Sequence, residues 1–209
     1  AYLFTGSRGT GKTTCARIFA KAINCLNPKD GEPCLECDIC KNADNGALAD
    51  IIEIDAASNS KVDDIRELRE GVMFTPEVCK YKVYIIDEVH MLSQAAENAL
   101  LKTLEEPPEH AIFILATTDP QKVRSTIRSR CMQLNFRRVT EEELVEGMKR
   151  ICSRRGIHAT DDALSTIASR ADGSVRDALS ILEQCTAAGD KERNRAAVLE
   201  YTGAAGPDF

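Results

Sequence analysis

The sequence predicts an α/β protein with a five-stranded parallel sheet, followed by a small helical domain. Two observations carry this prediction: short apolar runs alternate with helix-like stretches about five times, and the strand-like runs stop after Phe136. Apolar runs that are rich in β-branched residues and lack polar alternation are typical of parallel strands covered on both faces. Strands that alternate with helices in this way indicate a doubly wound sheet.

The expected elements follow one another in a simple order. Strands are expected at residues 2–4, 51–54, 83–86, 111–116 and 132–136. The helices between them are expected at 12–23, 62–72, 94–104 and near 123–129. The later helices are expected at 140–155, 160–170, 174–187 and 191–201. Thr140, with Glu143 three residues on, forms a capping-box pattern and indicates where the first of these later helices begins.

Composition excludes several classes of protein. The 209 residues carry 27 Lys+Arg against 33 Asp+Glu, and the net charge of −6 excludes a globally basic nucleic-acid coat. The longest apolar stretches are of strand length, well below the roughly 20 residues of a transmembrane helix. Nine cysteines are many, yet no secretory segment precedes them. We therefore expect a cytoplasmic protein without a disulfide framework.

A glycine-rich segment lies between the first expected strand and the first expected helix. It fits the pattern G-x-x-x-x-G-K-[ST] in the structural context that this pattern requires. Its residues, the candidate nucleotide-binding set, are Gly6, Ser7, Arg8, Gly9, Thr10, Gly11, Lys12 and Thr13. The glycines let backbone N–H groups face an anion, while Lys12 reaches the β- and γ-phosphates and Thr13 coordinates Mg²⁺. The sequence therefore predicts an ATP or GTP site.

Two acidic residues, Asp87 and Glu88, directly follow the third expected strand. The carboxyl end of a parallel strand is where α/β proteins bind ligands, and a phosphate loop needs an acidic strand end to hold its metal. We assign Asp87 to the metal side of the nucleotide and Glu88 to the general base that polarises the attacking water. The alternative is a pair of solvated acids. His90 is interpreted as a structural neighbour.

Several segments together resemble the clamp-loader branch of the AAA+ ATPases, and within it the gamma/tau family of bacterial DNA polymerase III subunits. They are the glycine-rich loop and residues 87–92, 100–108, 116–119 and 129–131. The resemblance runs along essentially the whole chain. It implies an AAA+ nucleotide-binding domain at 1–137, a helical lid domain at 138–203 and the start of a linker to a collar domain at 204–209. The implied activity is ATP hydrolysis that opens a sliding clamp and loads it onto primed DNA, as part of a DNA-directed DNA polymerase holoenzyme.

The resemblance also implies roles for single residues. Thr118 matches the family's first sensor, Arg176 matches the second sensor at a helix start in the lid, and Arg130 matches the arginine finger that enters a neighbouring subunit's ATP site. A finger in trans requires a ring or spiral of clamp-loader subunits. Lys61 and Lys102 match positions that contact the DNA backbone. The basic residues of 122–138 form a candidate patch for the subunit interface or for DNA, the alternative being a solvated helix face.

Four cysteines have the spacing of metal ligands. Cys25, Cys34, Cys37 and Cys40 follow the pattern C-x8-C-x2-C-x2-C on a loop that contains Pro and Gly. Four thiolates suit tetrahedral Zn²⁺ and leave no open position, so we predict a structural zinc module at 25–40. The gamma/tau family carries such a module at this place. An iron–sulfur cluster is the alternative. The other cysteines, Cys15, Cys79, Cys131, Cys152 and Cys185, are interpreted as small buried residues.

Two functional alternatives stay open at this point. One is a loader scaffold that binds nucleotide without hydrolysing it, although such subunits typically lack part of the phosphate loop. The other is a different DNA-acting AAA+ ATPase, such as a helicase loader or a branch-migration motor. Such a protein is not expected to combine the cysteine module with the Ser-Arg-Cys segment that contains Arg130.

Overall fold

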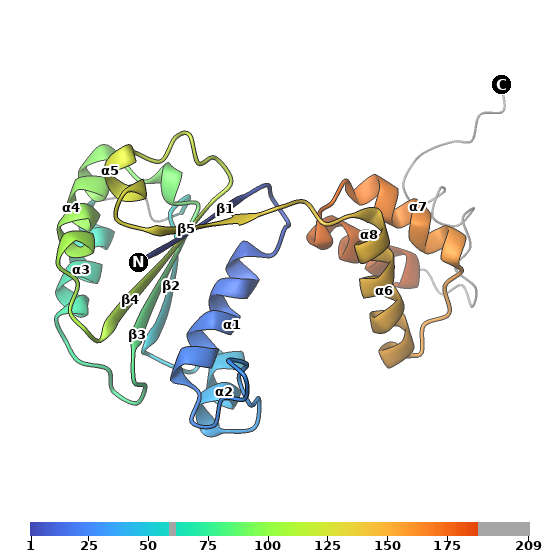
Figure 1. Cartoon of the computed structure of the whole chain (residues 1–209), viewed down its shortest axis with the longest axis horizontal. Coiled ribbons are helices and arrows are strands. Elements are labelled where there is room, and N and C mark those ends of the chain that lie inside the picture. The colour runs from blue at the N-terminus through green and yellow to red at the C-terminus, as the bar shows by residue number, and fades with distance from the viewer. Residues whose placement is uncertain (59–61, 188–209) are drawn as a thin grey trace. The chain divides into compact units, whose positions relative to one another are not determined.

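The structure is a computed structural model that describes residues 1–58 and 62–187. The chain divides into two compact units (Figure 1). The first consists of Ala1–Gly6 and Lys12–Phe136, and the second of Ser7–Gly11 with the described part of Arg137–Phe209. No helix within these described ranges is long and apolar enough to cross a membrane.

The first unit contains one five-stranded parallel sheet in the order β2-β3-β4-β1-β5. The strands are β1 (Tyr2–Gly6), β2 (Ile51–Asp55), β3 (Lys82–Asp87), β4 (Ala111–Thr117) and β5 (Met132–Phe136). Thr5 pairs in register with Thr117, and Asp55 pairs with Asp87, so the carboxyl ends of these strands lie along one edge of the sheet. The predicted five-stranded parallel sheet is confirmed, and Asp87 lies at the edge where α/β proteins bind ligands.

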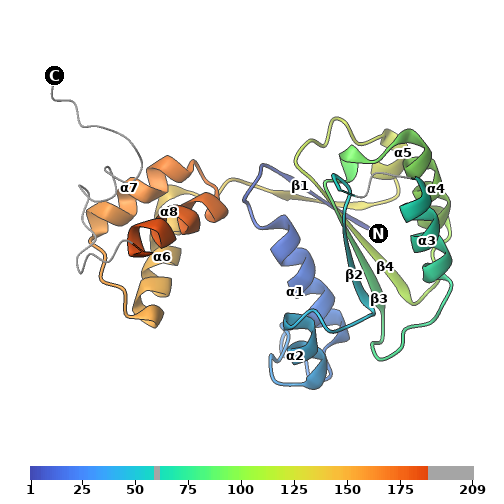
Figure 2. The ribbon, with the colours of Figure 1, turned by 180° about the vertical axis from the view of Figure 1, so that it is seen from behind.

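Helices cover both faces of the sheet, as the continuous apolar runs predict (Figures 1 and 2). One face packs against α3 (Val62–Val72), α4 (Gln94–Glu105) and α5 (Ser125–Arg128), and the other against α1 (Lys12–Asn24). In β3, Tyr84 and Ile86 join the core on the first side, whereas Val83 and Ile85 pack with Ala16 of α1. Successive strand residues point to opposite faces, so the buried middle residues of this central strand, Val83 to Ile86, are all apolar or aromatic.

The chain between α1 and β2 contains a helix that was not predicted. A loop was expected here, whereas α2 spans Asp38–Asp44 and lies beside α1. Cys37 is its N-cap and Cys40 lies in its first turn. A helix of seven residues is too short to show an apolar period, which is why the pattern gave no signal. Lys21 of α1 forms an ion pair with Asp44 at the end of α2.

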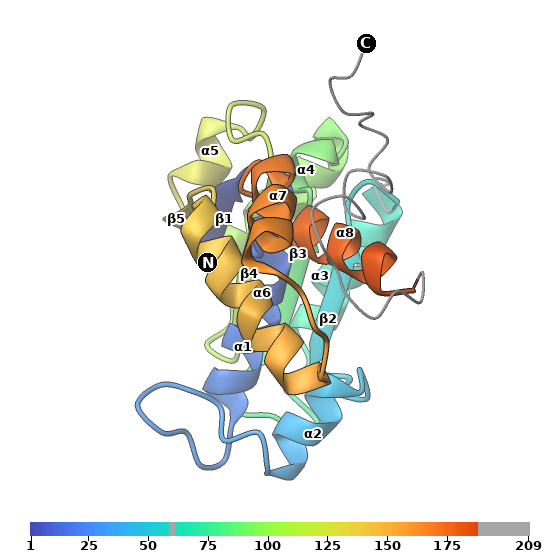
Figure 3. The ribbon, with the colours of Figure 1, turned by 90° about the vertical axis from the view of Figure 1, so that its right-hand side faces the viewer.

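Three helices form the core of the second unit (Figure 3). They are α6 (Glu141–Arg155), α7 (Asp161–Ala171) and α8 (Val175–Ala187). The expected capping box is present: the Thr140 hydroxyl accepts from the Glu143 N–H, and the Glu143 carboxylate accepts from the Thr140 N–H. A hydrogen bond from Arg137 is the main cause that lowers the pKa of Glu143 to about 2. The helix expected at 191–201 and the linker at 204–209 lie outside the described residues.

Asp50 holds the loop that precedes β3. Asp50 is 1% exposed. Its carboxylate accepts hydrogen bonds from the backbone N–H groups of Glu77 (2.9 Å), Val78 (2.8 Å) and Cys79 (2.9 Å). Burial raises the pKa of Asp50, but the three N–H donors and the Lys82 ammonium outweigh it, so the pKa lies below its ordinary value. The ionised form of Asp50 therefore stabilises the folded chain.

Replacing Asp50 with asparagine should lower the free energy of unfolding by about 3 kcal/mol near neutral pH. The side chain loses its charge, and its NH₂ group then faces backbone N–H donors from which it cannot accept hydrogen bonds. The pKa is lower in the folded chain, so this contribution is complete above the unfolded pKa of about 3.9 and is lost as the pH falls through the folded value. Urea unfolding between neutral and acid pH measures both effects. Asp50→Asn should lose less stability than wild type on acidification. Asp162→Asn, at an exposed residue that forms no ion pair among the described contacts, is the control and should change little. An acid response of Asp50→Asn equal to that of wild type would contradict this role.

Candidate nucleotide and metal sites

The glycine-rich loop connects β1 to the first residue of α1. Gly6, Gly9 and Gly11 have φ angles of 148°, 76° and 92°, a backbone geometry that other residues rarely adopt. At Gly6 a Cβ atom would lie 2.3 Å from the carbonyl oxygen of Phe136, so only glycine fits there. The N-terminus of α1 follows at once, and the N–H groups of a helix N-terminus favour a bound phosphate. The loop therefore has the backbone of an anion site.

Lys12 and Thr13 begin α1 and face polar partners at this edge. Lys12 is 6% exposed, and its Nζ donates to the carbonyl oxygen of Gly6 at 2.8 Å. The Thr13 hydroxyl donates to Oδ2 of Asp87 at 2.6 Å. A hydroxyl and a carboxylate oxygen at one point are ligands that suit Mg²⁺. The structure thus brings the lysine, the hydroxyl and the strand-end carboxylate together.

Glu88 follows Asp87 in a left-handed backbone conformation, with φ at 49°. Its Oε2 accepts hydrogen bonds from the Thr118 hydroxyl (2.8 Å) and from the Thr118 N–H (3.1 Å). Left-handed geometry costs energy at a residue with a side chain, and such strain clusters at functional sites. The strained turn directs Asp87 and Glu88 to different partners, so the two neighbouring acids can serve different purposes.

His90 completes the surroundings of Glu88. Its Nδ1 lies 3.3 Å from Oε2 of Glu88 and 2.9 Å from the hydroxyl of Thr117. The side chain of His90 is only 9% exposed. Thr117 was not predicted as part of this cluster, because its position at the end of a buried strand shows only in the sheet register. His90 and Thr118 together limit where the Glu88 carboxylate can lie.

Five of the basic residues between Lys122 and Arg138 form ion pairs with carboxylates. Their partners are Asp119 for Lys122, Glu97 for Arg124, Glu105 for Arg130, Glu143 for Arg137 and Asp172 for Arg138. Several of these carboxylates lie far away in the sequence, on α4 and after α7, so a count of charges within the segment could not reveal them. Ion pairing within the chain does not test the predicted role of these residues at a subunit interface or on DNA, which stays a prediction.

The remaining predicted site residues lie at separate places. Arg130 follows α5 and is bound by Glu105. Arg176 is the second residue of α8, is exposed, and follows Val175, whose N–H donates to the Gly9 carbonyl at 2.9 Å within the second unit. Lys102 is exposed on α4, and Lys61 lies outside the described residues.

The four clustered cysteines converge on one point. The sulfur atoms of Cys25, Cys34, Cys37 and Cys40 all lie within 4.8 Å of one another. The Cys25–Cys37 and Cys34–Cys40 sulfur distances are both 4.0 Å. Backbone N–H groups of Cys34 and Cys37 donate to the sulfurs of Cys25 and Cys34, each at 3.3 Å. Four sulfur atoms around one ion with bonds of about 2.3 Å lie about 3.8 Å apart, so the cluster fits a single tetrahedral metal.

The thiols of Cys37 and Cys40 in this cluster differ in pKa. Backbone hydrogen bonds lower the pKa of Cys37 to about 6, with the Leu26 amide as the largest cause. Burial, followed by the neighbouring sulfurs, raises the pKa of Cys40 to about 12. A cation at the centre would favour the thiolate form of all four ligands. The donor set therefore matches a metal that binds thiolates.

The five other cysteines only partly fit the expectation of buried residues. Cys152 and Cys185 are buried in the core of the second unit, and Cys79 and Cys131 are half-buried. Cys15 is exposed on α1, which corrects the expectation for that residue. Its place in a strongly helical segment was clear from the sequence, but the face of α1 that packs on the sheet was not.

Comparison with known families identifies the chain. Residues 1–140 match the family described as DNA polymerase III, delta subunit, and residues 143–191 match the family described as DNA polymerase III clamp loader subunit, ATPase lid domain. The chain belongs to the DNA polymerase III clamp-loader subunits. The resemblance to the gamma/tau family is confirmed, because relatives with those names align over most of this clamp-loader chain.

Two tau subunits illustrate the relationship. The DNA polymerase III subunit tau of Bacillus subtilis (strain 168) is 58% identical over 184 residues, which are 88% of this chain and 33% of that protein. The subunit tau of Escherichia coli (strain K12) is 48% identical over 203 residues, 97% of this chain and 32% of that protein. The clamp-loader chain thus spans about a third of the length of these relatives.

The fold is shared with solved structures of a branch-migration motor. The RuvB Holliday junction branch migration motor of Thermotoga maritima superposes with a TM-score of 0.69 and 23% identity, over 99% of this chain and 62% of that one. The expected P-loop AAA+ fold, with a parallel sheet followed by a helical lid, is confirmed. The far higher identity to tau subunits favours the clamp-loader family over the branch-migration alternative.

Proposed function

We propose that this chain is the ATP-hydrolysing part of a bacterial clamp-loader motor subunit, which uses ATP to open a sliding clamp and load it onto primed DNA during replication. One observation carries the proposal: at the end of β3, Asp87 contacts Thr13 of the phosphate loop while the adjacent Glu88 contacts Thr118. A scaffold that only binds nucleotide does not need a second carboxylate held apart from the first. The family membership and the names of the tau relatives support the clamp-loading part.

In the proposed reaction, a water molecule attacks the γ-phosphorus of ATP, its proton passes to Glu88, and the bond to the leaving ADP breaks. The described contacts of Glu88 use Oε2, so Oε1 is the oxygen assigned to that proton. Lys12 and the backbone of 6–13 bind the β- and γ-phosphates, and Thr118 reports on the γ-phosphate as first sensor. From the lid, Arg176 is the second sensor, and Arg130 acts on the ATP of a neighbouring subunit.

Mg²⁺ is the metal we assign to the nucleotide. Thr13 and Asp87 are the residues that would hold it, because their oxygen atoms lie 2.6 Å apart beside the phosphate loop. When bound, the ion would neutralise charge on the β- and γ-phosphate oxygens.

For the cysteine cluster we infer structural zinc. The 4.0 Å separations of its sulfurs support a single ion, since a cluster of several iron atoms would hold its cysteine sulfurs farther apart. The site joins the end of α1 to the start of α2, and its four cysteines fill all four positions of a tetrahedral ion, so none is left for water or substrate. Its role is therefore to stabilise the fold of 25–40.

The zinc proposal predicts about one zinc per chain by elemental analysis. Changing Cys37 and Cys40 together to serine should remove the metal, because two thiolate ligands do not hold structural zinc. Changing Cys15 and Cys79 together to serine is the matched control and should leave the zinc content intact. Nucleotide binding should survive in both variants, since neither touches 6–13. Iron with acid-labile sulfide in the purified protein would contradict the assignment.

The proposed partners are other clamp-loader subunits, arranged in a ring or spiral, together with the sliding clamp and primed DNA. The exposure of Lys102 is compatible with the proposed DNA-backbone contact, and Lys61 is proposed for the same role from the family resemblance. We assign 1–137 to the nucleotide-binding domain, 138–203 to the lid and 204–209 to the linker toward a collar domain.

The experiment that tests the function uses the full-length subunit assembled with its partner subunits. ATP turnover should rise when the sliding clamp and primed DNA are added together, and clamps should appear on the DNA. Lys12→Ala should abolish ATP binding and both responses, because the phosphates lose the cation that reaches them. ATP binding without any turnover in the wild-type assembly would favour the scaffold alternative and overturn the proposal.

A further inference from the structure

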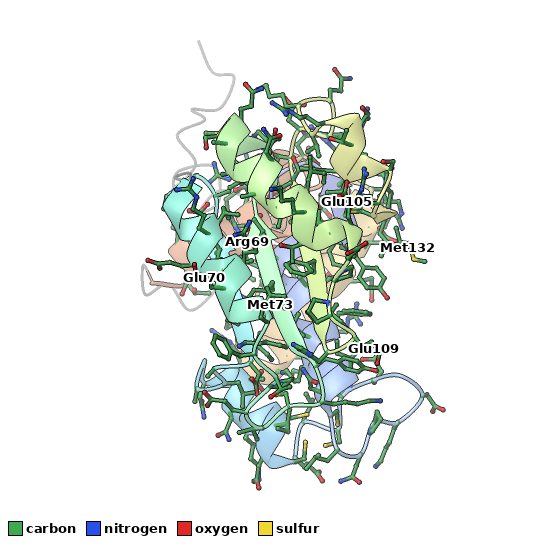
Figure 4. The ribbon with its side chains drawn as sticks, turned by 90° about the vertical axis from the view of Figure 1, so that its left-hand side faces the viewer. Arg69, Glu70, Met73, Glu105, Glu109 and Met132 are labelled. Carbon is green, nitrogen blue, oxygen red and sulfur yellow. The ribbon has the colours of Figure 1, made fainter. Side chains whose placement is uncertain are left out.

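A carboxylate on α4 holds the side chain of Arg130. Nη2 of Arg130 donates to Oε1 of Glu105 at 2.7 Å, and Nη1 donates to the carbonyl oxygen of Thr126 at 2.8 Å. Glu105 is the last residue of α4, and Thr126 lies in α5. Figure 4 shows Glu105 on the same side of the unit as Met132, the residue that begins β5 shortly after Arg130.

These two contacts orient the guanidinium group. One acceptor would let the planar group turn about a single hydrogen bond, whereas acceptors on both terminal nitrogens define its plane. The backbone is held as well, because the Arg130 N–H donates to the Ile127 carbonyl at 3.0 Å. The side chain nevertheless stays 34% exposed, and a guanidinium has five N–H donors. The group is therefore held in one orientation and still accessible to an anion.

A second ion pair attaches the same segment to α4 farther upstream. Nε of Arg124 lies 2.7 Å from Oε2 of Glu97, whose side chain is 7% exposed. Arg124 also donates to Asn98 at 3.3 Å. The segment from Arg124 to Arg130 is thus attached at both ends to α4, and α4 begins shortly after Glu88.

We propose that Glu105 is a positioning residue for Arg130, which holds its guanidinium in the orientation that meets the nucleotide phosphates of a neighbouring subunit. This rests on the proposed role of Arg130 as an arginine finger. A long side chain such as that of Arg130 loses conformational entropy when it binds a partner. Glu105 already restricts the rotamers of Arg130, so less entropy remains to be lost when the subunits meet. An exposed ion pair adds little to folding stability, so the pair acts on orientation rather than on stability.

The test uses assemblies of full-length subunits with clamp and primed DNA, in which two versions of this subunit are mixed. One version carries Glu88→Gln and supplies the finger, and the other carries Arg130→Ala and supplies the working ATP site. Turnover then arises where the finger of the first meets the site of the second. Adding Glu105→Ala to the finger-supplying version should lower kcat by about three- to tenfold with KM for ATP unchanged. Adding it to the site-supplying version should have no further effect.

Two variants sharpen the comparison. Glu105→Gln keeps an acceptor oxygen and should recover part of the lost kcat when placed in the finger-supplying version. Glu106→Ala removes the neighbouring carboxylate, which is not a partner of Arg130 among the described contacts, and should leave kcat as it was. All variants should keep the melting temperature of wild type.

Three results would overturn the inference: an unchanged kcat, a raised kcat that marks Glu105 as a restraint, or an equal loss in both versions that marks a structural role. Failure of the proposed function gives a different pattern. If the mixed assembly without any change at Glu105 shows no turnover although wild type does, Arg130 does not act in trans. The inference is overturned together with that role.

Discussion

Replacing Arg130 with alanine is expected to lower the ATP turnover of the assembled clamp loader by about 10³–10⁵, the range measured for arginine fingers in phosphoryl transfer. In the proposed assembly, this planar cation would stabilise charge that develops on the transferring phosphoryl group. ATP binding should persist, because the phosphate loop belongs to the other subunit of each pair. Steady-state turnover and nucleotide binding measured on the same assembly separate the two effects.

The controls for Arg130 distinguish charge from geometry. Arg130→Lys keeps the positive charge but loses the planar fork, so most of the loss should remain. Lys122→Ala removes another exposed cation, paired with Asp119 rather than held at the end of α4, and should leave turnover near the wild-type value. A loss with Lys122→Ala as large as with Arg130→Ala would show that only the overall charge of the segment matters.

Glu88→Gln is expected to reduce turnover by about 10²–10⁴, the usual contribution of a general base, while ATP stays bound. Glutamine retains an oxygen that accepts from the Thr118 hydroxyl, so the local structure should persist. It cannot take the proton of the attacking water. A single-turnover measurement with prebound ATP isolates this step from binding and product release.

A matched carboxylate provides the control for Glu88. Glu53 on β2 forms an exposed pair with Arg17 at 2.6 Å, and Glu53→Gln should change turnover little. Asp87→Asn should act differently, because it removes the proposed metal ligand and should weaken the Mg²⁺ dependence of ATP binding. Turnover by Glu88→Gln at the wild-type rate would exclude Glu88 as the base and would assign the proton to another acceptor.

The features that could be predicted are local in the chain. The five strands were predicted because each is a continuous apolar run, and the phosphate loop because its glycines and Lys12 lie within eight consecutive residues. The clustering of Cys25, Cys34, Cys37 and Cys40 was predicted for the same reason, since their short spacing brings four sulfurs together. Helix α2 escaped prediction because seven residues are too few to show a period.

The features that could not be predicted depend on contacts between distant segments. Glu105 was read as part of a family motif, and nothing local showed that it faces Arg130, 25 residues later. The three N–H groups that converge on Asp50 come from a loop 27 to 29 residues away. A charge count along 122–138 similarly could not show which acids pair with Arg124, Arg130 and Arg138, because those acids lie elsewhere in the chain.

The sequence by itself determined the α/β architecture, the phosphate loop, the paired acids at the end of β3 and the cluster of four cysteines, because each depends on periodicity or spacing over a short stretch. Only the tertiary structure decided which charges meet. The parallel pairing of β3, β4 and β1 places the end of β3 at the same sheet edge as the start of α1, where Asp87 meets Thr13. The strained turn at Glu88 directs Glu88 to Thr118, and the end of α4 brings Glu105 to Arg130. The physical reason is that an ion pair or hydrogen bond acts over a few ångströms in space, whatever the separation of its partners along the chain.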